Sequence, residues 1–176
     1  IGGIFRGDNL KKASRVMFYG FEFLCLGFIG WLYEIIVTLI LHGRYEDRGM
    51  LDIPVCPIYG FCGFVLLLMF RKVKNPFYIF FGAAAAVTVI EYAASYVLET
   101  WFHLYLWDYY EWALNLNGRV SLISSMIFGG LALLLIKVLH PLSDKICEKL
   151  PNWASFAVGL CSVLLIAVDL AAVIMR

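Results

Sequence analysis

The sequence predicts an all-α protein in which a bundle of about five helices crosses a membrane. Of its 176 residues, 62% are hydrophobic and 15% are charged, whereas soluble domains are about half apolar and a quarter charged. Five apolar runs are long enough, or nearly so, to cross about 30 Å of hydrocarbon. We expect a single integral membrane domain over residues 1–176, because this length leaves no room for a separate soluble domain.

The predicted spans lie near residues 17–41, 54–70, 77–99, 120–139 and 153–175. The first is about 25 residues long, too long for the apolar core of a signal peptide, so we expect it to be retained. The second is the shortest and contains Pro54, Pro57 and Gly60. It is predicted to begin as a broken or re-entrant piece, which membranes tolerate where the backbone is buried in protein or lines a cavity. Small-residue stretches at Gly82 and Gly129 predict close packing of the third and fourth spans.

The Lys and Arg residues alternate between two sides of this arrangement. Ten fall on one side, namely Arg6, Lys11, Lys12, Arg15, Arg71, Lys72, Lys74, Lys137, Lys145 and Lys149. Four fall on the other, namely Arg44, Arg48, Arg119 and Arg176. Cytoplasmic loops are enriched in Lys and Arg, so this pattern predicts a cytoplasmic N-terminus and an outer C-terminus. We expect a multi-pass protein of the cell membrane, of the bacterial cytoplasmic type, with membrane lipids as its surroundings.

Three spans contain a carboxylate, at Glu34, Glu91 and Asp169. Each costs roughly 2.5–3.5 kcal/mol at a bilayer centre and is therefore expected to face protein or trapped water. Counted from the basic side at 1.5 Å per residue, all three lie about 21–25 Å along their helices, in the outer part of the membrane. Glu99 and Arg119 fall near this level, which predicts one acidic and arginine-containing site. The alternative is a set of interhelical contacts that only hold the bundle together.

Two loops on the outer side add to this prediction. One runs from the first to the second span and contains Arg48, the other candidate cation for the acids. The other contains Trp101, Phe102, Tyr105, Trp107, Tyr109, Tyr110 and Trp112. Such aromatics commonly form a belt at the headgroup level, and the alternative is a lid over a substrate site.

The sequence predicts no metal site, no disulfide framework and no cofactor. The three histidines are widely separated, and the five cysteines form no C-x-x-C pair. A Walker loop is absent from the sequence, so this chain is not expected to hydrolyse ATP itself. The net charge of +1 also argues against nucleic acid as a partner, because such binding relies on many cations that meet phosphates.

The segments GWLYE, RGMLDIPVCPIYGF, IEYAASYVLETWFHLYLWDY and LNLNGRVSL, followed by an Asp in the last span, resemble the signature segments of the ABC-transporter type IV (CmpB-like) membrane family. The resemblance covers residues 20–175 and implies a permease-like component, with a homo-oligomer or a separate ATPase subunit as partner. It marks Glu34, Arg48, Gly49, Pro57, Tyr59, Gly60, Glu91, Tyr92, Glu99, Trp107, Asp108, Tyr109, Asn115, Asn117, Gly118, Arg119 and Asp169.

These observations lead to a hypothesis of transport with two alternatives. A transport component would bind a small polar or charged solute through Glu34, Arg48, Tyr59, Glu91, Tyr92, Glu99, Trp107, Asp108, Asn115, Asn117, Arg119 and Asp169. An intramembrane lipid-modifying enzyme of the outer leaflet would use Glu34 or Glu91 as general base, with an arginine holding a lipid phosphate. A membrane assembly subunit would use the polar cluster only to pair helices. The sequence assigns no catalytic residue.

Overall fold

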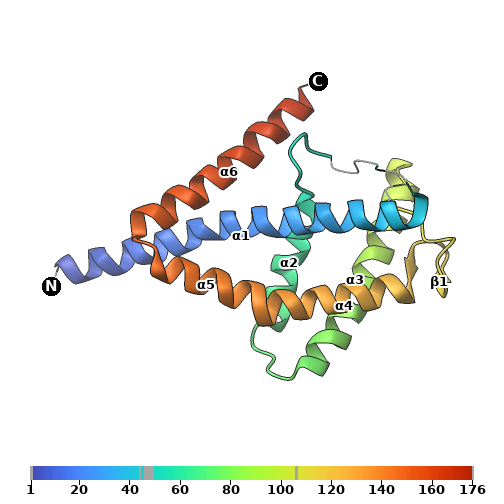
Figure 1. Cartoon of the computed structure of the whole chain (residues 1–176), viewed down its shortest axis with the longest axis horizontal. Helices are drawn as coiled ribbons and strands as arrows, with labels where there is room; N and C mark the ends of the chain where they lie inside the picture. Colours follow the sequence, from blue (N-terminus) through green and yellow to red (C-terminus); the bar gives the residue numbers. More distant parts are fainter. Residues whose placement is uncertain (1, 44, 46–49, 106, 176) are drawn as a thin grey trace. The chain divides into compact units, whose positions relative to one another are not determined.

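The computed structural model describes residues 2–43, 45, 50–105 and 107–175, without the side chains of residues 2–8, 41 and 42. The chain is helical almost throughout (Figure 1). Its helices are α1 (Gly2–His42), α2 (Pro57–Phe70), α3 (Pro76–Val97), α4 (Leu122–Leu134), α5 (His140–Lys149) and α6 (Asn152–Ile174), with π-helical turns η1 (Leu98–Phe102) and η2 (Leu135–Leu139). The strands β1 (Asn115–Leu116) and β2 (Val120–Ser121) form one antiparallel pair.

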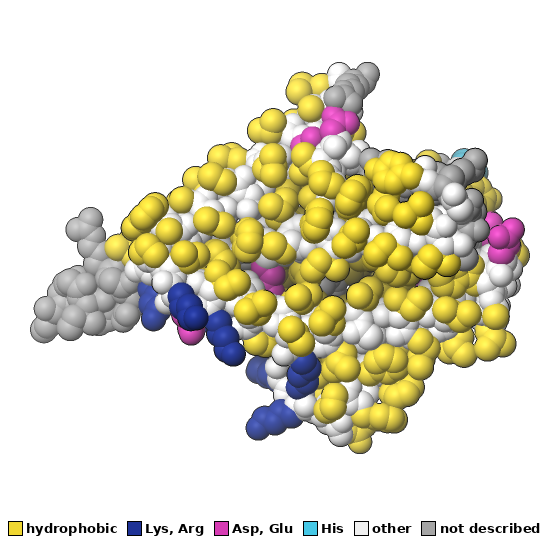
Figure 2. Space-filling model, viewed as in Figure 1, with side chains coloured by type: hydrophobic (Ala, Val, Ile, Leu, Met, Phe, Trp, Pro, Cys, Tyr) yellow, Lys and Arg dark blue, Asp and Glu magenta, His cyan; other side chains and the backbone are white. Residues whose placement is uncertain are grey.

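Among the described residues, four helical segments are long and apolar enough to cross a membrane, namely Asn9–Ile40, Pro76–Phe102, Leu122–Lys149 and Asn152–Ile174. Hydrophobic side chains cover most of the face shown in Figure 2. These features confirm the predicted class, an all-α protein with several membrane spans. The remaining apolar helix, α2, has 14 residues, fewer than the about 20 that a full crossing requires.

The third of these segments extends ten residues beyond the predicted end at position 139, to Lys149. Pro141 lies one residue after the start of α5, where its ring would clash with the carbonyl of residue 137 in a regular α-helix. The π-helical turn η2 lies at this point, and a widened turn of this kind accommodates a proline without ending the helix.

The chain divides into two compact units, the first made of residues 1–65 and 140–176. In this unit α6 packs against α1 at two glycines. A Cβ added at Gly159 would lie 2.0 Å from the carbonyl oxygen of Met17, and one at Gly20 would lie 2.9 Å from the carbonyl oxygen of Gly159. The two backbones therefore touch, as small residues allow in membrane helices.

The irregular segment before α2 also packs on α1 within the first unit. The amide of Cys56 donates to the carbonyl oxygen of Gly27 at 3.0 Å, and a Cβ on Gly27 would lie 2.5 Å from Val55. Leu51, Val55 and Cys56 are buried. This segment is thus covered by protein at Leu51, Val55 and Cys56, while Asp52 and Pro54 are exposed. Non-helical chain is tolerated at membrane depth where protein covers it.

The second unit, residues 66–139, is built on α3 and α4. Its core consists of Leu66, Ala83, Val87 and Ala132. A Cβ on Gly129 would lie 2.7 Å from the carbonyl oxygen of Phe80, so these two helices also approach closely. The predicted role of the small residues in the third and fourth spans is consistent with this contact.

Within the second unit, α3 and α4 run in opposite directions. At one end the Lys137 ammonium in η2, after α4, donates to the carbonyl oxygen of Lys74 at 2.8 Å. This bond joins the end of that helical segment to the basic loop of Arg71, Lys72 and Lys74. Asn75 caps α3 there by accepting from the amide of Phe77 at 2.9 Å. At the other end Ser121 and Ser124 form a capping box for α4. The strand pair lies at this capped end, opposite the basic loop.

Candidate functional site

A tight hairpin in the second unit positions Arg119. Asn117 and Gly118 have φ values of 54° and 66°, and the amide of Arg119 donates to the carbonyl oxygen of Leu116 at 3.1 Å. Two consecutive left-handed residues define a type I′ turn, for which Asn-Gly is the preferred sequence. A Cβ on Gly118 would also lie 2.5 Å from the ring of Tyr110, so glycine is required by both backbone and space.

The Arg119 side chain pairs with Glu99 and lies against two tyrosine rings. Its Nη2 donates to Oε2 of Glu99, and the guanidinium carbon is 5.5 Å from the ring centroids of Tyr92 and Tyr96. A cation at this distance is attracted by the negative face of an aromatic ring. The hydrogen bond to Glu99 raises the pKa of Arg119 above its ordinary value, so Arg119 stays charged.

Further hydrogen bonds hold this pair in place. Trp107 Nε1 donates to the carbonyl oxygen of Arg119 at 3.0 Å, and the side-chain amide of Asn117 donates to the Tyr92 hydroxyl at 3.0 Å. The Tyr105 hydroxyl donates to Oε1 of Glu99 at 3.3 Å, and the charge of Glu99 raises the pKa of Tyr105. We refer to the side chains of Tyr92, Tyr96, Glu99, Tyr105 and Arg119 as the arginine cluster.

One polar atom of the arginine cluster is buried without a hydrogen-bond partner in the described part of the chain. This atom is Nε of Arg119, whose side chain is 17% exposed. Buried donors are nearly always paired with protein, water or a ligand. This N–H is therefore a donor for which the described residues supply no partner.

Three other predicted residues of the second unit, Glu91, Asp108 and Asn115, form hydrogen bonds with the loop that precedes Arg119. The Tyr109 hydroxyl donates to Oε1 of Glu91 at 3.2 Å, and the Tyr109 amide donates to the carbonyl oxygen of Gly118 at 2.8 Å. Asp108 accepts from the amide of Tyr110 at 2.8 Å, a turn typical of Asp. The side-chain amide of Asn115 donates to the carbonyl oxygens of Tyr110 and Trp112 at 3.1 and 3.0 Å. Asp108 and Asn115 thus serve the loop's own folding.

The predicted residues of the first unit form two separate contacts. The Tyr59 hydroxyl donates to Oε1 of Glu34. Asp169 accepts from the backbone amide of Asp52 at 2.9 Å. Arg48 lies outside the described residues. Glu91 belongs to the second unit, and its convergence with Glu34 and Asp169 stays a prediction.

Sequence reasoning missed two residues that the structure places in polar clusters. Tyr96 is one turn after Tyr92 on α3, and this i, i+4 spacing before Glu99 was a usable signal. Glu22 is 4% exposed and its Oε1 lies 2.8 Å from Nδ1 of His140. It stands in the apolar run FYGFEFLCLGF, so the criterion that identified Glu34 applied to it as well.

In the part of the chain that the structure describes, no group of three or more His, Cys, Asp or Glu side chains is placed to hold a metal ion. The fold and the polar clusters define a polytopic α-helical membrane protein with ionisable side chains in and beside its spans. Residues 21–174 match the model of a family described as "Putative ABC-transporter type IV". The chain belongs to this family, as its resemblance in sequence implied. No curated protein and no solved structure matches the chain.

Proposed function

We propose that the protein is a permease-like component of a cell-membrane transporter that binds a small solute with an anionic group at the arginine cluster. Membership of an ABC-transporter family and four apolar helices support a transport component. The observation that carries the solute site is the buried, unpartnered Nε of Arg119 beside an Nη2 that already binds a carboxylate. Guanidinium groups hold carboxylates or phosphates with two such parallel N–H groups.

In this proposal, Glu99 and the solute compete for the Arg119 guanidinium. It neutralises Arg119 when the site is empty, which lowers the cost of keeping a cation in a partly buried place. Tyr105 donates to the other oxygen of Glu99 at 3.3 Å. Glu99 therefore keeps a donor when Arg119 turns to a solute, so exchange leaves neither charge without a partner.

The arginine cluster lies at the end of the second unit opposite the basic loop that Lys137 contacts. Since basic loops are typical of the cytoplasmic side, this supports binding in the outer half of the membrane. A single small bundle forms a poor pathway, so we propose that the chain works as an oligomer or with a separate ATPase subunit. The family of the chain supports the ATPase partner.

The test uses the tryptophan that contacts the site. The purified protein is titrated in lipid nanodiscs with glutamate, malate and inorganic phosphate, and uptake of the same labelled anions is measured in proteoliposomes. Tryptophan fluorescence is followed in the wild type and in Trp107→Phe, whose difference isolates the signal of Trp107 among the five tryptophans. We expect saturable binding of at least one anion, loss of binding and uptake in Arg119→Gln, and normal behaviour in the control Arg71→Gln. Arg71 is an exposed cation directly after α2, so the control removes the same charge elsewhere.

Three results would contradict the proposal. Equal binding by the wild type and Arg119→Gln would show that Arg119 does not bind the solute. Failure of all three anions to bind would contradict an anionic group as the feature that the site recognises. Conversion of a lipid by the protein in detergent, without any gradient, would instead support the lipid-modifying alternative. Loss of folding in Arg119→Gln with no anion bound by the wild type would support an assembly role.

A further inference from the structure

A buried acid and a histidine form a pair in the first unit that the proposed transport site does not use. Oε1 of Glu22 on α1 lies 2.8 Å from Nδ1 of His140 on α5, and Oε2 lies 3.4 Å from the Ser143 hydroxyl. The Glu22 side chain is 4% exposed and that of His140 is 20% exposed. An ionisable group in a membrane span is costly and is typical of functional sites such as proton relays.

The pair continues into a chain of charged groups. Nε2 of His140 is 3.9 Å from Oδ2 of Asp144, and Oδ1 of Asp144 is 2.8 Å from Nη2 of Arg15. The same Arg15 nitrogen is 3.9 Å from Oε1 of Glu148. Exposure of the side chains falls steadily along this series, from 61% at Glu148 through 44% at Arg15 and 31% at Asp144 to 4% at Glu22. The groups thus lead from the surface to the buried acid.

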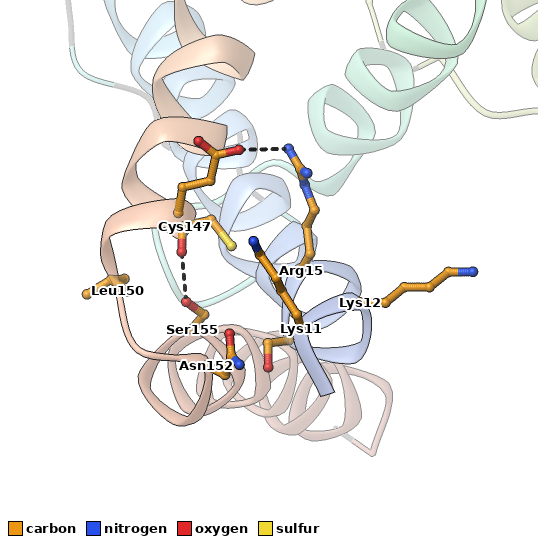
Figure 3. A pocket seen from close by; sticks show the side chains of 9 residues that line it. Lys11, Lys12, Arg15, Cys147, Leu150, Asn152 and Ser155 are labelled. Carbon is orange, nitrogen blue, oxygen red and sulfur yellow. Dashed lines mark hydrogen bonds and ion pairs between the residues drawn. The ribbon is translucent and has the colours of Figure 1, made fainter. Parts of the chain in front are cut away.

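The exposed end of this series, formed by Arg15 and Glu148, borders a cavity of about 270 Å³. It is lined by residues of the first unit, among them Lys11, Arg15, Glu148 and Asn152. Figure 3 shows the Arg15 side chain in this cavity, with Lys11 beside it and Lys12 extending away. The polar and charged side chains around this cavity give solvent water access to Arg15 and Glu148, at the start of the series.

We propose that Glu22 and His140 form a proton-binding site that exchanges protons with solvent through Asp144, whose side chain is 31% exposed and whose partner Arg15 lines this cavity. A proton taken up by Asp144 passes to Nε2 of His140 while the proton on Nδ1 moves to Glu22, so one proton enters and one is delivered. The 3.9 Å step between Asp144 and His140 is bridged by one water molecule or a side-chain rotation. Arg15 holds Asp144 in position and transfers nothing, because its guanidinium does not release a proton.

The surroundings of the pair are compatible with this role. From α1, Tyr19 stacks on the His140 ring with centroids 6.3 Å apart. From α5, Ser143 and Asp144 face it. The buried residues of α6 are Ser155, Gly159 and Ser162, which carry no charge. The inference is independent of the arginine cluster, which lies in the other unit.

The test is infrared spectroscopy of the protein in lipid bilayers, titrated from about pH 4 to pH 9, the range in which histidine pairs change charge. We expect a protonated-carboxyl band that disappears in Glu22→Gln and keeps its midpoint in the control Glu111→Gln, which removes an exposed carboxyl of the other unit. Its midpoint should move by about one pH unit or more in His140→Gln, because coupled groups titrate as a pair. After a pH jump, the band should respond on the order of 100-fold more slowly in Asp144→Asn, which removes the donor.

If Glu22→Gln does not fold, nuclear magnetic resonance of the wild type with ¹⁵N-labelled histidine provides a second test. The ¹⁵N resonances of His140, assigned by their absence in His140→Gln, should titrate within the same pH range. Constant His140 resonances, a carboxyl band that survives in folded Glu22→Gln, or an unchanged midpoint in His140→Gln would overturn the proposal. An unchanged rate in Asp144→Asn would overturn the path through Asp144. Anion binding at the arginine cluster is measured separately and is expected to persist in Glu22→Gln.

Discussion

Replacement of Gly159 by alanine is expected to separate α1 from α6. The added Cβ would lie 2.0 Å from the carbonyl oxygen of Met17, 2.4 Å from its carbonyl carbon and 2.8 Å from the amide nitrogen of Phe18. All three are backbone atoms, so no side chain can rotate away. To reach the ordinary contact distance of 3.4 Å, the helices must move apart by about 1.4 Å, which forfeits more than half of each affected dispersion contact.

We therefore expect Gly159→Ala to lower the free energy of unfolding by about 2–3 kcal/mol, the upper part of the range for overpacked sites. Reversible unfolding in mixed micelles, followed by circular dichroism, measures this change. Gly130→Ala is the matched control, because its Cβ would meet only a ring carbon of Phe80 at 3.8 Å. Alanine is also the better helix former, so this control should be neutral or stabilising. Equal stability of Gly159→Ala and the wild type would refute the close contact between α1 and α6.

Two further predictions concern polar contacts. Glu34→Leu and Tyr59→Phe should show a coupling of about 0.6–1.7 kcal/mol in a double-mutant cycle of unfolding, the range for hydrogen bonds between membrane helices. Glu34→Leu with exposed Tyr45→Phe should be additive. Additivity of the first pair would contradict the bond between Tyr59 and Glu34. The raised pKa of Tyr105, caused by the charge of Glu99, means that the unfolded chain ionises first as pH rises. Stability should therefore fall from about pH 10 upward, and Tyr105→Phe should lose this part of the dependence; an identical pH profile for the variant would show that Glu99 does not act on Tyr105.

Much of the fold could be predicted from runs of apolar residues, because length and hydropathy alone decide whether a helix can cross a membrane. The short α2 was indicated by Pro54, Pro57 and Gly60, which interrupt the apolar run. The continuation of the helix to Lys149 could not be predicted in this way. The apolar run ends near position 139, whereas the helical hydrogen bonding continues to Lys149. Hydropathy indicates which part of a helix lies in hydrocarbon. It does not indicate that the backbone continues as a helix through the π-helical turn before Pro141.

The candidate site was predictable only in part. Glu99 and Arg119 were placed at one level by counting residues along helices, and the structure pairs them. Asp108 and Asn115 were selected by resemblance, yet their hydrogen bonds fold the loop. The Asn-Gly turn at 117–118 was a readable hairpin signal that sequence reasoning did not use. The turn matters because it fixes the backbone position from which the Arg119 side chain reaches Glu99.

The sequence by itself determined the class of the protein and the residues whose charge is costly in a membrane, because both follow from composition and position along single helices. Only the tertiary structure decided which partner each charge has. Arg119 meets Glu99 across 20 residues of sequence and Glu22 meets His140 across 118. Such pairs depend on which helix faces touch and on glycines that let backbones approach, and periodicity within one helix contains no information about its neighbour.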